Sequence, residues 1–316
     1  MKKVVVIGEI LVEIMADTPG DGFRAPQPLT GPFPSGAPAI FADQMARLVQ
    51  PVALVSAVGD DDFGRLNLER LQRDGVDVSA VLVDPDRPPG SAFVRYRHDG
   101  SRDFVFNIRH SAAGRAHRTV AVEQALAAAD HVHVMGSSLS SPEFVALNIE
   151  AVETVRARGG TVSFDPNLRK EILAAPGMED ATRRILGLTD LFLPSGDEPM
   201  LFTRESDPEA AMAELLDRGI AAIVHKRGVD GATFFDRNGK IAVPAFRVAE
   251  VDPTGAGDCF GATFVAMWLR GSDPREALRL AAASGALAVT RRGPMEGTAS
   301  LDELTAFIRA VDERKR

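Results

Sequence analysis

The sequence predicts an α/β fold in which a doubly wound, mainly parallel sheet carries helices on both faces. Three observations support this. Short apolar strand-like runs alternate with amphipathic helical segments along most of the chain. The first run, residues 4–7 (VVVI), is continuously apolar, which is typical of a strand buried on both faces. The 316 residues and ordinary composition allow a large core.

The first part of the chain already shows this alternation. Residues 37–48 form an expected helix, because Ile40, Phe41, Met45 and Leu48 recur near one face. Residues 18–35 are rich in proline and glycine, which favours a loop or edge strand over a helix. The elements expected up to residue 75 are a strand at 4–7, the loop or edge strand at 18–35, a helix at 37–48, a strand at 52–58, and a helix at 63–74 closed by Gly75.

Residues 91–106 have a different pattern. Apolar and polar side chains alternate roughly, and the pair Asp99-Gly100 separates two halves rich in aromatic and β-branched residues. An Asp-Gly pair between such halves is a strong signal for a β-hairpin. We therefore predict an antiparallel excursion from the α/β chain.

Helices and strands alternate again after this hairpin. Glycines follow several expected helices, as at 159–160 and 219, where they can adopt the left-handed conformation that ends a helix. The expected helices are 120–129, 142–158, 178–186, 208–218, 258–270 and 274–291; the expected strands are 131–135, 161–164, 191–194 and 220–226, with a hairpin at 233–243 that turns at Asn238-Gly239.

Charge and cysteine content exclude several classes of function. Lys and Arg number 36 against 44 Asp and Glu, a net charge of −8, which argues against a nucleic-acid surface. The single cysteine, Cys259, permits no intramolecular disulfide and no Cys-rich zinc site. No apolar run is long enough to span a membrane, and Glu9 and Glu13 interrupt the N-terminal run too early for a signal peptide. We expect a cytoplasmic protein without membrane or nucleic-acid partners.

The most informative segment is 252–258 (DPTGAGD), which precedes an apolar helix. Gly255, Ala256 and Gly257 leave backbone N–H groups unshielded at a helix N-terminus, where the helix dipole also favours an anion. The carboxylate of Asp258 beside such a site can take a proton from an attacking hydroxyl while the N–H groups stabilise a phosphoryl group. The alternative is a glycine-rich turn with Asp258 as the N-cap of the helix.

Two common nucleotide-binding motifs are missing. No Gly-Lys-Ser/Thr follows a spaced glycine, so there is no Walker A loop, and Gly8 is followed by Glu9-Ile10 rather than by a dinucleotide fingerprint. His131 and His133 alternate along an expected strand and could bind a metal, but further ligands at suitable spacing are missing, which favours histidines satisfied within the sheet.

Segment 252–258 resembles the second signature of the ribokinase-like (PfkB) carbohydrate kinases, and the similarity covers essentially the whole chain. The other segments that resemble the family are 8–13 (GEILVE), 35–39 (SGAPA), 58–64 (VGDDDFG), 165–169 (DPNLR) and 226–232 (KRGVDGA). Within the family, segments 165–169 and 107–109 (NIR) most resemble the corresponding segments of the 2-keto-3-deoxygluconate kinases.

This resemblance implies a single ribokinase-like kinase domain over residues 1–316, with a small β-sheet lid from about 10–33 and 88–110. It implies Asp258 as the catalytic base and Gly255, Ala256 and Gly257 as the anion hole. ATP and Mg²⁺ are the implied cofactors, with a monovalent cation such as K⁺ as a further ligand. Glu198 matches a glutamate linked to the magnesium–phosphate site. The positions implied for nucleotide binding are Asn167, Ser195, Lys226, Gly228, Gly255 and Gly257.

The resemblance also implies residues that bind the sugar or sugar acid. Glu13 falls where relatives carry an acidic ligand of sugar hydroxyls, and Gly36 lies in the substrate turn. Arg109 and Arg169 would approach the acid end of the substrate, since the planar guanidinium can bind both carboxylate oxygens; surface arginines are the alternative. Asp258 would contact the reacting hydroxyl.

Three positions depart from the family pattern: Ser35 replaces a glycine, and Ile40 and Ser195 stand where asparagine is usual. Because isoleucine cannot hold a sugar hydroxyl, a ketohexose such as tagatose or fructose is the alternative acceptor. From another class of function, the alternative is a catalytically silent sugar-binding regulatory protein. An exposed edge of the lid makes a homodimer the expected assembly.

Overall fold

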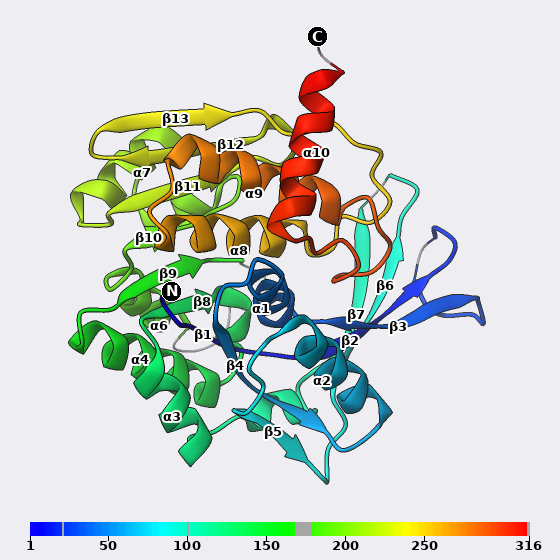
Figure 1. Ribbon diagram of the computed structural model, residues 1–316. Helices are drawn as coiled ribbons and strands as arrows, with labels where there is room; N and C mark the ends of the chain where they lie inside the picture. Colours follow the sequence, from blue (N-terminus) through cyan, green and yellow to red (C-terminus); the bar gives the residue numbers. More distant parts are fainter. Residues whose placement is uncertain (21, 100, 168–177, 315–316) are drawn as a thin grey trace.

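A computed structural model describes residues 1–20, 22–99, 101–167 and 178–314, and Figure 1 shows its arrangement. Its centre is a nine-stranded sheet in the order β13-β12-β11-β10-β9-β8-β1-β4-β5. Neighbouring strands are parallel from β5 to β11, and the last two, β12 and β13, run antiparallel. The strands are β1 (Val4–Ile7), β4 (Val52–Gly59), β5 (Val81–Asp84), β8 (His131–Met135), β9 (Thr161–Asp165), β10 (Leu191–Phe192), β11 (Ala222–Lys226), β12 (Ala232–Asp236) and β13 (Gly239–Val243).

Helices cover both faces of this sheet, which confirms the predicted fold class. Successive residues of β1 are fully buried and alternate between two cores: Val4 and Val6 pack in one, Val5 and Ile7 in the other. The first core includes α1 (Ala37–Arg47), α2 (Asp62–Asp74), α8 (Ala256–Leu269), α9 (Pro274–Ala288) and α10 (Leu301–Glu313). The second includes α3 (Val120–Ala128), α4 (Pro142–Ala157), α6 (Met178–Leu186) and α7 (Pro208–Asp217).

A separate four-stranded sheet, called the small sheet below, projects from the body at the right of Figure 1. Its order is β3-β2-β6-β7, with β2 and β6 parallel and the outer pairs antiparallel. The strands are β2 (Leu11–Ala16), β3 (Leu29–Ser35), β6 (Gly90–Tyr96) and β7 (Arg102–Asn107). The hairpin predicted from 91–106 is therefore β6–β7, and the proline-rich segment 18–35 ends in edge strand β3.

Several helices begin where a polar side chain caps the first turn. Asp61 accepts from the Gly64 N–H at 2.9 Å at the start of α2, and Gly75 ends this helix in the left-handed conformation. Ser141, Asp207 and Asp273 cap α4, α7 and α9 in the same way. Most predicted helices and strands are present with ends shifted by a few residues.

Three elements differ from the sequence prediction. The short strand β5 and the C-terminal helix α10 were not predicted, and α9 ends at Ala288 instead of continuing to residue 291. The chain turns there because the Val289 carbonyl accepts from the N–H groups of Val251 (2.7 Å) and Asp252 (3.2 Å). Among the described residues, no helix is long and apolar enough to cross a membrane.

Candidate active site

The N-terminus of α8 forms the glycine-rich turn predicted from 252–258. Gly255 is the N-cap with φ 81°, and a Cβ at this position would collide with the Pro294 carbonyl oxygen, so only glycine fits here. The helix begins at Ala256, two residues earlier than predicted. Asp258 is therefore the third helical residue, half-buried in the first turn, and the N-cap carries no side-chain capping bond. The alternative in which Asp258 caps the helix is wrong.

A buried carboxylate shapes the start of this turn. Asp252 is 1% exposed and accepts three hydrogen bonds. Its Oδ1 accepts from the Tyr96 hydroxyl at 2.6 Å and the Thr254 N–H at 3.0 Å, and its Oδ2 accepts from the Gly293 N–H at 2.9 Å. These bonds join the turn to the small sheet on one side and to the loop after α9 on the other.

The predicted acceptor turn at Ser35 and Gly36 lies at the N-terminus of α1. Gly36 has φ 111°, and a Cβ there would collide with the Glu9 carbonyl oxygen. Ile40, one turn into α1, has its Cγ2 3.3 Å from where a Cβ of Gly255 would lie. The acceptor turn and the turn before α8 are thus adjacent in space, although more than 200 residues separate them.

Two buried carboxylates flank the acceptor turn. Glu13 of β2 is 3% exposed, and its Oε2 accepts from the Ser35 hydroxyl at 3.2 Å. Glu9 is 5% exposed, and its Oε2 accepts from the Ser138 hydroxyl at 3.1 Å. Serine at position 35 therefore holds the predicted sugar ligand Glu13. Buried carboxylates next to hydroxyl donors suit a polyhydroxylated ligand, whose hydroxyls donate hydrogen bonds.

Four of the six residues predicted to bind the nucleotide, Asn167, Ser195, Lys226 and Gly228, lie at the carboxyl ends of β9, β10 and β11. Lys226 forms a buried ion pair with Asp165, whose Oδ1 accepts from the Asn167 N–H at 3.2 Å. Ser195 pairs with Lys226 in an isolated bridge between the strand ends. Gly228, with φ 54°, opens the short turn after β11. In an open parallel sheet, ligands bind at these strand ends.

Glu198 can contribute one ligand to a magnesium ion. It starts a short helical segment after β10, and its Oε2 accepts from the Ser195 N–H at 2.7 Å, which orients the carboxylate. No cluster of three or more His, Cys, Asp and Glu side chains that could hold a metal occurs in the part of the chain that the structure describes. Magnesium bound to a nucleotide needs no such cluster, because one or two carboxylates, phosphate oxygens and water complete its octahedron. The donor set at Glu198 therefore fits this ion.

Of the two arginines predicted to bind the acid end of a substrate, only Arg109 is among the described residues. Arg109 lies exposed in the turn after β7. Arg169 lies outside the described residues. The fold thus brings together Glu13 and Gly36, the residues predicted to bind sugar hydroxyls, and both sides of the pocket stay predictions.

The strand histidines are bonded within the sheet. His131 pairs with Thr161 (2.8 Å) and Ser163 (2.7 Å), and His133 contacts the same Ser163 hydroxyl at 2.7 Å while stacking on Phe41. Burial lowers the pKa of His131 to about 3 and that of His133 well below its usual range. Both rings are therefore neutral near pH 7.

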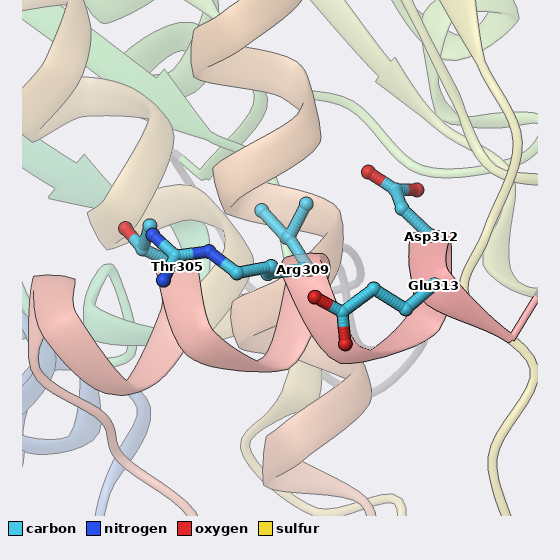
Figure 2. Close-up of a pocket in the computed structure, with 5 residues that line it drawn as sticks. Thr305, Arg309, Asp312 and Glu313 are labelled. Carbon is cyan, nitrogen blue, oxygen red and sulfur yellow. The ribbon is translucent and has the colours of Figure 1, made fainter.

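A hollow elsewhere on the surface is separate from these residues. Figure 2 shows side chains that line a cavity of about 440 Å³ along α10, and none of the site residues predicted from the sequence lines it. Its lining residues are Thr305, Ile308, Arg309, Asp312 and Glu313.

Arg102 of β7 also reaches the turn before α8, where it donates to the Thr254 hydroxyl at 3.1 Å. The sequence did not point to several residues of the candidate site: Glu9, Tyr96, Arg102, Ser138, Asp165 and Asp252. Glu9, Asp165 and Asp252 stood inside the quoted motifs, and Tyr96 is the only tyrosine of the chain. No pattern in the sequence indicated that Tyr96 contacts Asp252, because 156 residues separate them.

Known proteins match nearly the whole chain. A profile of the pfkB family carbohydrate kinases matches residues 1–300. The chain is 34% identical to a 2-dehydro-3-deoxygluconokinase of Thermoproteus tenax, over 98% of this chain and 95% of that protein. A putative ribokinase II from E. coli, in complex with ATP and Mg²⁺, is 47% identical with a TM-score of 0.92, over 98% of this chain and 100% of its own.

A fructokinase double mutant from Vibrio cholerae O395, with fructose, ADP and potassium ion bound, is also similar. It is 27% identical with a TM-score of 0.81, and the alignment covers 97% of this chain and 98% of the fructokinase. Relatives that act on a sugar acid and on a ketohexose therefore both align with nearly the whole chain.

Proposed function

Because the chain belongs to the pfkB family of carbohydrate kinases, we propose that it transfers the γ-phosphoryl group of ATP to a hydroxyl of 2-keto-3-deoxygluconate or a related keto sugar. The observation that carries this proposal is the position of Asp258. It lies in the first turn of α8 directly after Gly255, Ala256 and Gly257, so a base and an anion site share one helix end.

In this mechanism each part of the turn has one task. The carboxylate of Asp258 takes the proton of the acceptor hydroxyl as its oxygen attacks the γ-phosphorus. The backbone N–H groups of Gly255, Ala256 and Gly257 stabilise the charge on the transferred phosphoryl group, and ADP leaves. The N–H groups of a first helical turn have no acceptor within the helix. The Ala256 N–H donates to the Pro253 carbonyl at 3.4 Å, a long hydrogen bond that it would exchange for one to the phosphoryl group.

The nucleotide would lie along the ends of β9, β10 and β11. We assign its contacts to Asn167, Ser195, Lys226 and Gly228, together with Gly255 and Gly257 at the phosphate end. Glu198 would hold a magnesium ion that, when bound, neutralises charge on the phosphates. The potassium ion of the Vibrio cholerae fructokinase supports a monovalent cation as a further ligand.

The acceptor would lie between the turn at Gly36 and Asp258. Glu13 would accept hydrogen bonds from its hydroxyls, and Arg109 and Arg169 would bind its carboxylate if the substrate is a sugar acid. A ketohexose is the second candidate. The buried carboxyl groups of Glu9 and Glu13 favour it, because they suit the neutral hydroxyl groups of such a sugar.

A coupled assay of ADP release over ketohexoses, pentoses and keto-deoxy sugar acids tests the function. We expect one keto sugar or keto sugar acid to support turnover with ATP and Mg²⁺. Tight sugar binding without ADP release across the panel would instead identify a silent sugar-binding protein and contradict the proposal.

Replacing the base tests the mechanism. Asp258→Asn should lower kcat by about 10²- to 10⁴-fold, the usual contribution of a positioned general base, and leave ATP binding intact. The matched control is Asp302→Asn, since Asp302 also lies in the first turn of a helix, α10. The control should keep its rate. A near-normal rate in Asp258→Asn would rule out Asp258 as the base.

A further inference from the structure

We infer that Tyr96 is a positioning residue for phosphoryl transfer, because its hydroxyl ties the small sheet to the buried carboxylate that shapes the turn before Asp258. This inference rests on the proposed function for its catalytic consequence. The structural coupling can be measured without any substrate.

The contact joins the last residue of β6 to the first residue of the signature segment. The Tyr96 hydroxyl donates to Asp252 Oδ1 at 2.6 Å, and the same oxygen accepts from the Thr254 N–H at 3.0 Å. Asp252 Oδ2 accepts from the Gly293 N–H at 2.9 Å. Of the three hydrogen bonds to this 1% exposed carboxylate, the one from Tyr96 comes from the small sheet.

The strand opposite makes a second contact to the same turn. Tyr96 and Arg102 are directly paired across β6 and β7, so their side chains project from the same face of the sheet. A terminal nitrogen of Arg102 lies 3.1 Å from the Thr254 Oγ1 and donates to it. One end of the β-hairpin therefore holds both Asp252 and Thr254, the residues that lead into Gly255.

Burial explains why the tyrosine hydroxyl matters. When a buried carboxylate loses a donor, the free-energy cost of its desolvation is no longer offset. The group then moves toward other donors, or water enters to replace the lost one. Either response shifts Thr254, whose N–H shares the same oxygen. Burial and the neighbouring Asp252 raise the pKa of Tyr96 above its usual value, so the hydroxyl keeps its proton at neutral pH.

The expected consequence is a dependence of the anion site on the small sheet. When the small sheet is in the position described here, Tyr96 and Arg102 hold the turn in the geometry that places the first N–H groups of α8. A change in the position of the small sheet would release Asp252 and Thr254 together. Tyr96 would thereby act on the phosphoryl end of the reaction without touching a substrate.

The variant Tyr96→Phe removes the hydroxyl and keeps the ring. We expect backbone amides in 252–258 to exchange hydrogen about tenfold faster in the ligand-free protein, measured by mass spectrometry. We expect kcat to fall about tenfold with KM for ATP within twofold, because one hydrogen bond to a charged group is lost. Arg102→Gln should give a smaller change in the same direction.

The matched control is Asp103→Asn in the same hairpin. Asp103 of β7 accepts two hydrogen bonds from Arg97, the residue that follows β6, at 2.7 and 2.8 Å, and so joins the two sides of the hairpin without contacting 252–258. This variant should leave both the exchange of 252–258 and kcat unchanged. If it reproduces the Tyr96→Phe result, loosening of the hairpin explains the effect and the inference is overturned.

The remaining outcomes also decide the question. Unchanged exchange in Tyr96→Phe overturns the coupling, and faster exchange with unchanged kcat overturns its role in catalysis. If the wild-type protein phosphorylates no sugar in the panel, the proposed function fails. The exchange measurement then still tests whether Tyr96 holds the turn.

Discussion

Asp258 and Cys259 are consecutive residues of α8 with opposite environments. Asp258 is half-buried in the first turn, whereas Cys259 is fully buried, and its carbonyl accepts from the Ser284 hydroxyl of α9 at 3.2 Å. One residue of a helix corresponds to a rotation of about 100°, enough to move a side chain from the site into the core. The helix geometry thus separates the carboxylate proposed as the catalytic base from a packed thiol.

The thiol of Cys259 should therefore be unreactive in the folded protein. Burial raises its pKa well above the usual value, and the charge of Asp258 adds to this effect, so the nucleophilic thiolate is suppressed. Iodoacetamide at pH 8 should leave the native protein unlabelled over an hour and modify it rapidly in urea. Since the chain has a single cysteine, intact mass reports the result directly. Rapid native labelling would contradict this burial.

At the scale of elements, a buried polar cluster joins α1, α2 and the loop before α10. Arg70 of α2 pairs with Asp74 (2.7 Å), Glu296 (2.9 Å) and Asp43 of α1 (3.3 Å), and it donates to the Met295 carbonyl at 2.7 Å. The loop that begins at residue 293 also lies beneath Gly255. The cluster therefore connects α1, which follows the acceptor turn, to the loop whose Pro294 carbonyl packs against Gly255.

This cluster should make stability depend on pH. Burial raises the pKa of Asp43 from 3.8 to about 7, although Arg70 opposes the shift. Between these values the folded protein binds more protons than the unfolded chain, so the Asp43 contribution to stability falls as pH rises from about 4 to about 7. Burial by itself would raise the pKa of Asp74. Its hydrogen bond with Asp43 and its contacts with Arg70 outweigh burial and hold the pKa below its usual value. The contribution of Asp74 to the stability of the protein is therefore lost only in acid.

The variant Asp43→Asn removes the contribution of Asp43 to the pH dependence of stability, because an amide does not ionise in this range. Buried His131 contributes a slope of opposite sign, so the difference between wild type and variant is the quantity to measure. We expect the free energy of unfolding of the variant, minus that of the wild type, to increase by about 2 kcal/mol from pH 5 to pH 7.5. Urea denaturation at several pH values measures this gain.

The control for this measurement is Asp312→Asn, which removes an exposed ion pair with Arg279 of α9. Its stability should follow the wild-type pH profile between pH 5 and pH 7.5. Parallel profiles for Asp43→Asn and wild type would show that Asp43 is ionised throughout this range, and would contradict the predicted shift.

At the scale of the whole molecule, the small sheet ends in a strand that no other described strand pairs with on its outer side. Strand β7 lies at one end of this sheet and carries three large apolar side chains that are about 40% exposed: Phe104 (38%), Val105 (47%) and Phe106 (38%). An exposed apolar edge strand favours pairing with another chain. We propose that two copies of this chain associate through β7; the sequence predicted a homodimer but not which edge of the small sheet would form it.

Light scattering after size exclusion tests the assembly. The wild-type protein should elute with the mass of a dimer, and Val105→Lys should shift it to the monomer because the change places a charge on the paired edge. Val120→Lys is the control, since Val120 is 70% exposed at the start of α3. A monomeric wild type, or a dimer that persists in Val105→Lys, would contradict the proposal.

Local patterns were sufficient to predict most of the elements. Some short segments strongly favour one local conformation. The apolar run at 4–7 predicted β1, and the Asp-Gly pair at 99–100 predicted the β6–β7 hairpin. Gly75 predicted the end of α2. The missed helix α10 also had a local signal. Ser300 and Glu303 form a capping box at its start, but the helix follows a turn-rich segment and was not recognised.

By itself, the sequence determined the fold class, the family and the turn from Gly255 to Asp258, because each depends on short segments with strong conformational or chemical preferences. Tertiary structure alone decided which distant residues meet. Tyr96 reaches Asp252, Ile40 packs near Gly255, and Arg70 joins three segments, because strand order and helix packing bring them together. Asp258 could be named from its neighbours in the chain, but the residues that hold its turn could be identified only after the chain was folded.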